Sequence, residues 1–391
     1  MRIGRDELSR PATAFAGFFC LLAGNSILRP VRDQVGAAQG ASNLPWMFAA
    51  TLAAVLAAAP LFTLLTARIP RARCLPLAYR AFAAGLLAAW AGLHAHGAWA
   101  PAALFVWTGV CNLLSVSLFW ALLTDVFGRP QASRLFGPIA AGGTAGTLAG
   151  PLLVEWLVRP LGAANLLLVC VALLELSVHA AGALRSPDRI SPGPSLRAGL
   201  SAVLRSNFLL GVCGYVALLT WTGTLLYVEQ ARIVAHASAD PRERTLLFAR
   251  MDLAVSLITL ALQGILAGRV RIRGALAALP VLSAAAFVAL AIAPSLAVLA
   301  AAQGLRKAAH FGIERPAREV LFTSLDPEQK YSSKAFIDTA VYRSGDAIGA
   351  WFSQALSPGT LAPAALALCA LWLVNSLLLA GRDPAGSGGV R

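Results

Sequence analysis

The stretch LRKAAHFGIERPAREVLFTSLDPEQKYSSKAFIDTAVYRSGDAIGAW, residues Leu305–Trp351, concentrates charge in a chain that otherwise avoids it. Only 13% of the 391 residues are charged. Fourteen consecutive positions of this stretch nevertheless hold seven ionisable side chains: Arg306, Lys307, His310, Glu314, Arg315, Arg318 and Glu319. Such side chains are costly at membrane depth and mark functional sites there, so the first question is whether the stretch lies in a membrane.

Composition places the chain among membrane proteins. Hydrophobic residues make up 58% of the sequence and the mean hydropathy is +0.70. Ala, Leu and Val fill whole windows of about 20 residues, the length that a helix needs to cross the hydrocarbon core of a bilayer. A soluble protein with so much apolar surface would need a polar shell that this composition does not supply. The sequence therefore predicts an all-α membrane protein.

The apolar windows predict twelve transmembrane helices, six on each side of a polar break. They fall at about 11–29, 46–67, 75–95, 100–124, 137–158 and 162–184, then at about 208–229, 247–268, 275–293, 296–324, 334–356 and 361–380. In the break, Leu196, Leu200 and Leu204 recur every four residues and predict a short amphipathic helix on the membrane surface. The expected parts are an N-terminal half (1–184), a cytoplasmic linker (185–207) and a C-terminal half (208–391).

Basic residues gather in the loops that follow every second predicted span, which is the positive-inside pattern. That side and both termini are therefore expected to be cytoplasmic. One loop disagrees, because Arg232, Arg242 and Arg244 lie between the seventh and eighth spans. Arg outnumbers Lys by 29 to 3, as in a GC-rich bacterial coding sequence. We expect a multi-pass protein of a bacterial inner membrane.

Two pairs of segments about 200 residues apart indicate an internal repeat. ARIPRAR at 67–73 is similar to AGRVRIRG at 267–274, and LLTDVFGRPQASRLF at 122–136 is similar to LFTSLDPEQKYSSKAF at 321–336. Two parallel six-helix pseudo-repeats with a site between them are the major-facilitator type of secondary transporter. The alternative is that short basic turns recur in any polytopic protein.

The charges of the tenth span share one helical face. Lys307, His310, Glu314 and Arg318 stand at steps of three and four residues. Facing lipid, each ion would cost about 2.5 to 3.5 kcal/mol even on the lenient insertion scale, so the face should line the bundle interior. It predicts a cavity that binds an anion through Arg and Lys. The alternatives are snorkelling side chains at a helix end and a structural Glu–Arg network.

The eleventh span carries a sparser polar face, with Asp338, Tyr342 and Asp346 at steps of four and Arg343 beside them. Its carboxylates would balance the basic helix when the cavity is empty, and such pairs could break and re-form during transport. The alternative is a set of helix-to-helix salt bridges without a role in transport.

The first span ends in LRPVRD, residues 28–33. Pro30 disfavours helix at Arg29, so Arg29 and Arg32 are expected to project from a kinked helix into the cavity. Alternatively, Arg29 caps the C-terminus of the helix, where a cation is favourable.

Other residues and motifs are weaker indications of a functional site. Asp125 is more consistent with a gate or loop ion pair than with a ligand, and the pair Glu175 and His179 with a satisfied polar contact. GGTAG at 142–146 lacks the Lys-Ser/Thr of a phosphate loop and is better explained by close helix packing. The six cysteines show no metal-ligand spacing. The sequence therefore predicts no enzyme, no metal and no cofactor.

At these segments the chain resembles the ATP/ADP translocase family of plastids and intracellular bacteria, a major-facilitator-like family, and its homologues in free-living bacteria. Leu28, Arg29, Arg32 and Asp33 match a Leu-Arg-x-x-Lys-Asp motif of that family, with Arg in place of Lys. Phe119 and Trp120, ahead of Asp125, match a Phe-Trp pair of the family. The strongest similarity is to the family's motif in the tenth span and just downstream of it. The residues at those motif positions here are Lys307, His310, Phe311, Arg315, Pro316, Arg318, Glu319, Leu325, Asp326, Lys334, Ala335, Ile337 and Asp338. The resemblance implies transport of an anionic, phosphate-bearing solute.

Together these features predict a monomeric secondary transporter that exchanges nucleotides or related organophosphates by alternating access, with the lipid bilayer but no nucleic acid as partner. The expected substrate-binding residues are Arg29, Arg32, Lys307, His310, Arg315, Arg318 and Arg343. The expected gating or charge-pair residues are Asp33, Asp125, Glu314, Glu319, Asp338 and Asp346. The alternatives are a proton-coupled carrier of another metabolite and a non-transporting scaffold or lipid-handling protein.

Overall fold

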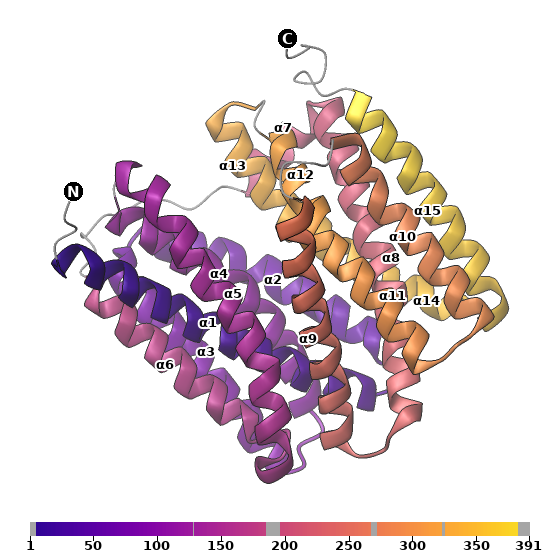
Figure 1. Ribbon diagram of the computed structural model, residues 1–391, viewed down its shortest axis with the longest axis horizontal. Coiled ribbons are helices and arrows are strands. Elements are labelled where there is room, and N and C mark those ends of the chain that lie inside the picture. The colour runs from indigo at the N-terminus through magenta and orange to yellow at the C-terminus, as the bar shows by residue number, and fades with distance from the viewer. Residues whose placement is uncertain (1–4, 128, 185–195, 267–271, 323–324, 382–391) are drawn as a thin grey trace. The chain divides into compact units, whose positions relative to one another are not determined.

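The computed structural model describes residues 5–127, 129–184, 196–266, 272–322 and 325–381, and its regular elements there are all helical (Figure 1). They are α1 (Arg5–Ala38), α2 (Leu44–Thr66), α3 (Arg71–His94), α4 (Ala100–Val126), α5 (Arg129–Leu161), α6 (Leu166–Ala183), α7 (Leu196–Leu204), α8 (Asn207–Ala237), α9 (Pro241–Leu266), α10 (Ile272–Ile292), α11 (Leu296–Ala309), η1 (His310–Glu314), α12 (Arg315–Leu321), α13 (Pro327–Phe336), η3 (Ile337–Val341), α14 (Tyr342–Ala355) and α15 (Pro358–Gly381). Residues 185–195 of the predicted linker and 267–271 of the predicted basic turn lie outside the described residues.

The described helices match the predicted spans. Nine of them are long and apolar enough to cross a membrane. The three remaining windows coincide with α5 and with two continuous helical columns: the tenth column (α11, η1 and α12) and the eleventh column (α13, η3 and α14). The prediction of an all-α membrane protein with twelve spans is confirmed.

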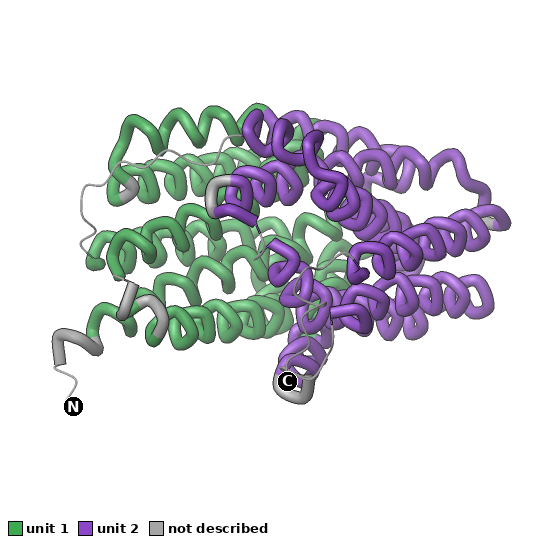
Figure 2. Tube along the Cα trace, turned by 90° about the horizontal axis from the view of Figure 1, so that it is seen from above, with its two compact units in different colours: residues 1–38, 57–193, 238–253 green, residues 39–56, 194–237, 254–391 purple. Residues whose placement is uncertain are grey.

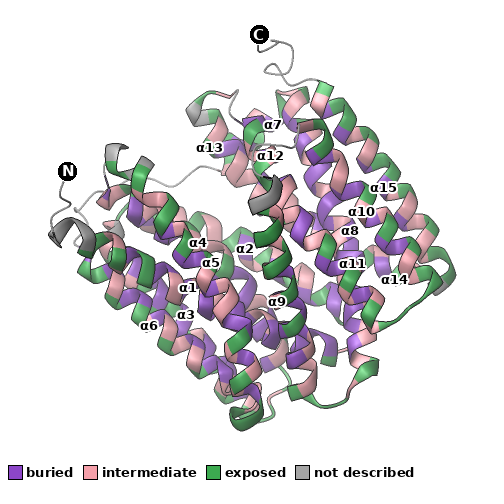
Figure 3. Ribbon diagram, in the orientation of Figure 1, coloured by how far each residue is buried: buried purple, intermediate pink, exposed green. Residues whose placement is uncertain are grey.

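Most helices bury one face and expose the other (Figure 3). Large apolar side chains stand on the exposed faces, and Leu61, Trp156 and Ile292 are 68%, 72% and 80% exposed. Exposure of such residues suits contact with lipid rather than with water.

The chain divides into two compact units, each assembled from separate stretches of sequence (Figure 2). Unit 1 comprises residues 1–38, 57–193 and 238–253, and unit 2 comprises residues 39–56, 194–237 and 254–391. Each unit has its own core of buried apolar side chains.

Unit 1 is built around the close contact of α1 with α5. Gly142, Gly146 and Gly150 follow one another every four residues along α5 and therefore share one face. A Cβ atom at Gly142 would lie 2.6 Å from the carbonyl oxygen of Phe15, and one at Gly146 would overlap the carbonyl oxygen of Phe19. The GGTAG segment thus lets two helix backbones approach each other, as the packing interpretation predicted.

Unit 2 is built around α8, which packs against α14 and α15. Gly345 and Gly349 of α14 face α8, and a Cβ atom at Gly349 would lie 3.0 Å from the carbonyl oxygen of Trp221. Trp372 of α15 is completely buried, and its ring meets that of Tyr215 edge-on at 5.5 Å. This packing fixes α8 beside the columns that carry the charged residues.

The short helix α7 forms where the leucine spacing predicted a helix, and it packs on α13. The face that it buries is not the leucine face. Gly199 and Val203 are buried, whereas Leu200 and Leu204 are exposed. A Cβ atom at Gly199 would overlap the carbonyl oxygen of Ser332, so the glycine permits the contact and leaves the leucines outward.

A π-helical turn interrupts each of the two charged columns. Residues 310–314 form η1, and residues 337–341 form η3. A single π-turn holds one residue more than an α-turn, is rare, and often marks a functional site. Both turns carry an acidic residue of the polar network described next, Glu314 and Asp338.

Candidate functional site: a buried ion network in unit 2

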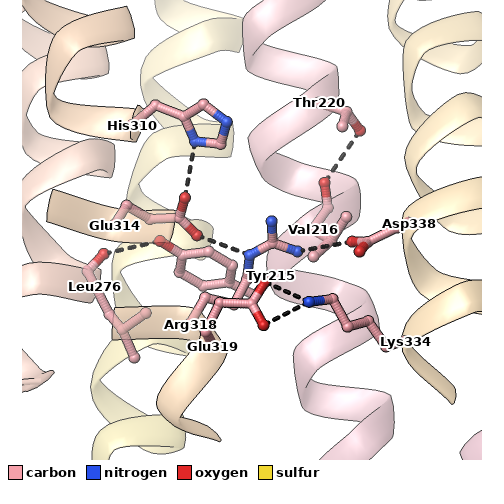
Figure 4. A network of polar contacts seen from close by, with 10 residues as sticks. All are labelled: Tyr215, Val216, Thr220, Leu276, His310, Glu314, Arg318, Glu319, Lys334 and Asp338. Atoms are coloured by element: carbon pink, nitrogen blue, oxygen red, sulfur yellow. Dashed lines mark hydrogen bonds and ion pairs between the residues drawn. The ribbon is translucent and has the colours of Figure 1, made fainter. Parts of the chain in front are cut away.

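Glu314 is the centre of a polar network inside unit 2 (Figure 4). Its side chain is only 1% exposed. The Oε2 atom lies 2.7 Å from Nδ1 of His310, and the Oε1 atom lies 3.1 Å from Nε of Arg318. A carboxylate buried without such partners would be strongly destabilising. Both oxygens of Glu314 are therefore committed to basic neighbours on its own column.

Arg318 connects the tenth column to the eleventh. Its Nη1 atom lies 3.2 Å from Oδ1 of Asp338, so one guanidinium contacts two carboxylates (Figure 4). The two acids differ in access to solvent, because Asp338 is 36% exposed whereas Glu314 is almost completely buried. Glu314 is thus a fixed partner of Arg318, and Asp338 is a partner that another anion can reach.

A second ion pair joins the same columns. Nζ of Lys334 on α13 lies 2.5 Å from each carboxylate oxygen of Glu319 on α12 (Figure 4). The side chains are 33% and 42% exposed. Water therefore screens this pair more than it screens the pair of Arg318 with Glu314.

Tyr215 of α8 lies against the network (Figure 4). Its hydroxyl donates to the carbonyl oxygen of Leu276 on α10 at 3.3 Å, so the ring is fixed between two helices. Deeper along α8, the Thr220 hydroxyl donates to the carbonyl oxygen of Val216 at 3.1 Å. Tyr215, Val216 and Leu276 belong to a buried apolar cluster of unit 2, and such low-dielectric surroundings strengthen electrostatic interactions.

Arg343 and Asp346 form a separate pair on α14. Arg343 Nη1 lies 3.3 Å from Asp346 Oδ2, and the guanidinium lies 5.7 Å from the centre of the Tyr342 ring. The hydroxyl of Thr224 on α8 donates to the other oxygen of Asp346 at 3.2 Å. Asp346 is therefore held from two helices.

Arg306 of α11 differs from the other basic residues at this site. It is half-buried, its Nε atom is inaccessible and has no acceptor, and it forms no hydrogen bond or ion pair with any residue that the structure describes. Its Nη2 atom lies 2.8 Å from the position of a Cβ on Gly223 of α8. Arg306 was not among the substrate-binding residues predicted from the sequence, although it stands four residues before His310.

Unit 1 holds the predicted residues of the first span. Arg29 donates to the hydroxyl of Ser26 at 2.9 Å, and its Nη1 atom lies 3.8 Å from Oδ2 of Asp252 on α9. Arg32 contacts its neighbour Asp33 through two donors, at 2.8 and 2.5 Å, and stands over the ring of Phe105 at 5.3 Å. Pro30 does not end the helix, because α1 continues to Ala38.

The structure brings several predicted residues of unit 2 together. His310, Glu314, Arg318 and Asp338 form one network, and Glu319 joins Lys334 beside it. Arg315 is exposed, and Lys307 and Asp125 are half-buried. Within the part of the chain that the structure describes, no group of His, Cys, Asp and Glu has the arrangement of a metal site.

Comparisons with known proteins find likeness at the level of structure. No family model and no curated protein matches the sequence. Among solved structures, a bacterial homologue of the iron transporter ferroportin in its inward-facing state is similar with a TM-score of 0.69 at 13% identity, over 96% of this chain and 99% of that one. The nucleoside transporter NupG matches with a TM-score of 0.67 at 13% identity, over 97% of this chain and all of the other. An auto-inhibited POT family peptide transporter gives 0.69 at 13% identity, over 98% of both chains.

These likenesses extend over nearly the whole of each chain, and the proteins concerned share the major-facilitator-type fold. The protein is therefore a multi-pass membrane protein of that fold, as the repeat and the twelve apolar windows predicted.

Proposed function

We propose that the protein is a secondary transporter that exchanges nucleotides or related phosphate-bearing anions across the membrane by alternating access. One observation carries the proposal: Arg318, deep in a helical column, shares its guanidinium between a buried and an accessible carboxylate. The solved structures of similar fold are transporters by their titles, and one of them is a nucleoside transporter.

The network can accept an anion by exchange of partners. Arg318 offers a planar fork of donors that suits a phosphoryl group. An incoming phosphate oxygen would replace the accessible carboxylate of Asp338, while Glu314 keeps the guanidinium in position. The displaced carboxylate would pair with Arg318 again when the substrate leaves, so Arg318 would not be left as an unbalanced charge.

We further propose a bacterial inner-membrane location with both termini in the cytoplasm, a monomeric state, and two six-helix halves at 1–184 and 208–391. The basic loops of the sequence support the orientation, and its segments repeated at about 200 residues support the two halves.

Counterflow tests the proposal. Reconstituted protein preloaded with ADP is expected to take up labelled ATP, and Arg318→Ala is expected to abolish uptake. Arg80→Ala is the matched control, because Arg80 is an exposed arginine that pairs with Glu175 at 3.2 Å in unit 1. No counterflow with any member of a panel of nucleotides and organophosphates would reject the proposal.

A second candidate is a proton-coupled carrier of another metabolite, which the 2.7 Å contact between His310 and Glu314 favours. Histidine titrates near neutral pH and commonly carries protons. A pH gradient would then drive uptake by the wild type and fail to drive it in His310→Gln. If no small anion shifts the melting temperature and no gradient drives uptake, a non-transporting scaffold or lipid-handling protein is favoured instead.

A further inference from the structure

The guanidinium of Arg306 has donors without acceptors. It lies in the predicted tenth span, its Nε atom is inaccessible, and within the described residues it makes no hydrogen bond or ion pair. Arginine keeps its charge under all ordinary conditions and carries five N–H donors. A cation in this position is costly unless an anion accompanies it.

The neighbouring carboxylates do not pair with Arg306. Glu314 uses one oxygen for His310 and the other for Arg318, and Asp338 contacts Arg318. Glu314 interacts with Arg306 electrostatically but forms no ion pair with it. The network therefore offsets part of the charge of Arg306 at a distance and leaves its donors unused.

The surroundings of Arg306 leave room for the guanidinium. Gly223 of α8 faces it, and a Cβ atom there would lie 2.8 Å from Nη2 and 3.7 Å from both Cζ and Nη1. Any side chain at position 223 would push the guanidinium away. The helix α8 thus lacks a side chain at the place where the guanidinium lies.

We propose that Arg306 is an anion-binding residue of this transporter and that it contacts an oxyanion, a phosphoryl group in the first instance, through two donors. The inference rests on the proposed function and deepens it by assigning the substrate's negative group to a residue outside the predicted set of substrate-binding residues. Arg318, in contrast, is held by protein carboxylates when no substrate is bound.

Direct binding tests the assignment. Purified full-length protein would be titrated calorimetrically with ADP and with pyrophosphate, as wild type and as Arg306→Gln, Arg306→Lys and Gly223→Ala. Loss of charged hydrogen bonds is expected to weaken binding by at least about tenfold in Arg306→Gln. Arg306→Lys keeps the charge but not the fork and should weaken binding less. Gly223→Ala should weaken binding without changing any charge.

Gly304→Ala is the matched control. Gly304 lies on the same helix as Arg306, and the nearest atom to a Cβ there is Cδ1 of Ile258 at 3.9 Å. This variant should bind like the wild type. Because Arg306→Gln could fail to fold, each variant is first checked by its melting temperature, and Gly223→Ala and Arg306→Lys keep the test informative.

The outcomes separate this inference from the proposed function. If wild type binds ADP and Arg306→Gln binds it equally tightly, the assignment of Arg306 is wrong while the proposed function stands. If wild type binds no anion, both fail.

The phosphate of a lipid headgroup has the same chemistry, so the titrations are repeated in nanodiscs of phosphatidylcholine with and without phosphatidylglycerol. If the wild type has the same affinity for ADP in both kinds of nanodisc, the result supports a soluble anion. If Arg306→Gln changes only the amount of phosphatidylglycerol that the protein retains, the assignment is overturned.

Discussion

Arg318 and Asp338 are joined between two helical columns, with Nη1 3.2 Å from Oδ1, although each column is interrupted by a π-turn at this level. The same guanidinium contacts Glu314, which is far less exposed than Asp338. The two carboxylates therefore have different relations to one cation, and substitutions at the two should have different consequences.

Removal of the buried charge should cost stability. Glu314→Gln leaves both His310 and Arg318 without their buried carboxylate, and breaking a buried pair in this way costs about 3 to 5 kcal/mol. Asp338→Asn removes a half-exposed partner and should change stability by no more than about 1 kcal/mol. The melting temperature in detergent measures both. Equal losses would show that the two acids play the same role.

The pair of Lys334 and Glu319 should contribute little to stability, because both side chains are about one-third exposed or more. The coupling energy from Lys334→Ala, Glu319→Ala and the double variant is expected to be about 0.2 to 1 kcal/mol. High salt should reduce it further. A coupling above about 2 kcal/mol, measured by the shift in melting temperature, would indicate that the pair is shielded from water and salt, contrary to this expectation.

Much of the fold follows from the sequence because a bilayer requires long apolar helices, and those are visible in one window at a time. Close packing of α5 on another helix could also be predicted, since small residues in an apolar span let helices approach each other, but its partner α1 could not. The π-turns were not accessible, because one extra residue in a turn leaves no periodic signal in a short window.

Part of the site could also be predicted, because part of it is a local sequence pattern. The spacing of His310, Glu314 and Arg318 is local and could be read from the sequence. Arg306 depends on an empty position on α8, and the partner of Arg29 comes from α9, far along the chain. Such relations arise only from tertiary packing. Arg315 was expected to bind substrate and is exposed in the structure.

The contact of α5 with α1 in unit 1 predicts the direction in which a Gly→Ala substitution changes the melting temperature. An alanine in place of a helical glycine gains about 1 kcal/mol of helix propensity. Gly146→Ala should nevertheless lower the melting temperature, because its Cβ would overlap the backbone of α1 and overpacking costs about 1 to 3 kcal/mol. Gly137→Ala on the same helix has no atom within 4 Å of the new Cβ and should be neutral or stabilising. Destabilisation by both would point to a general intolerance of α5 rather than to this contact.

Arg29 poses a question that stability and transport together can answer. Its Nη1 atom lies 3.8 Å from Asp252, a carboxylate that is almost completely buried. Arg29→Ala removes the cation and should lower the melting temperature, because the buried charge of Asp252 loses a partner. Asp252→Asn added to Arg29→Ala removes that buried charge and should restore most of the melting temperature. If Arg29 also binds substrate, as expected from the sequence, the double variant will be stable but impaired in counterflow. Recovery of counterflow together with stability would assign Arg29 a structural role only.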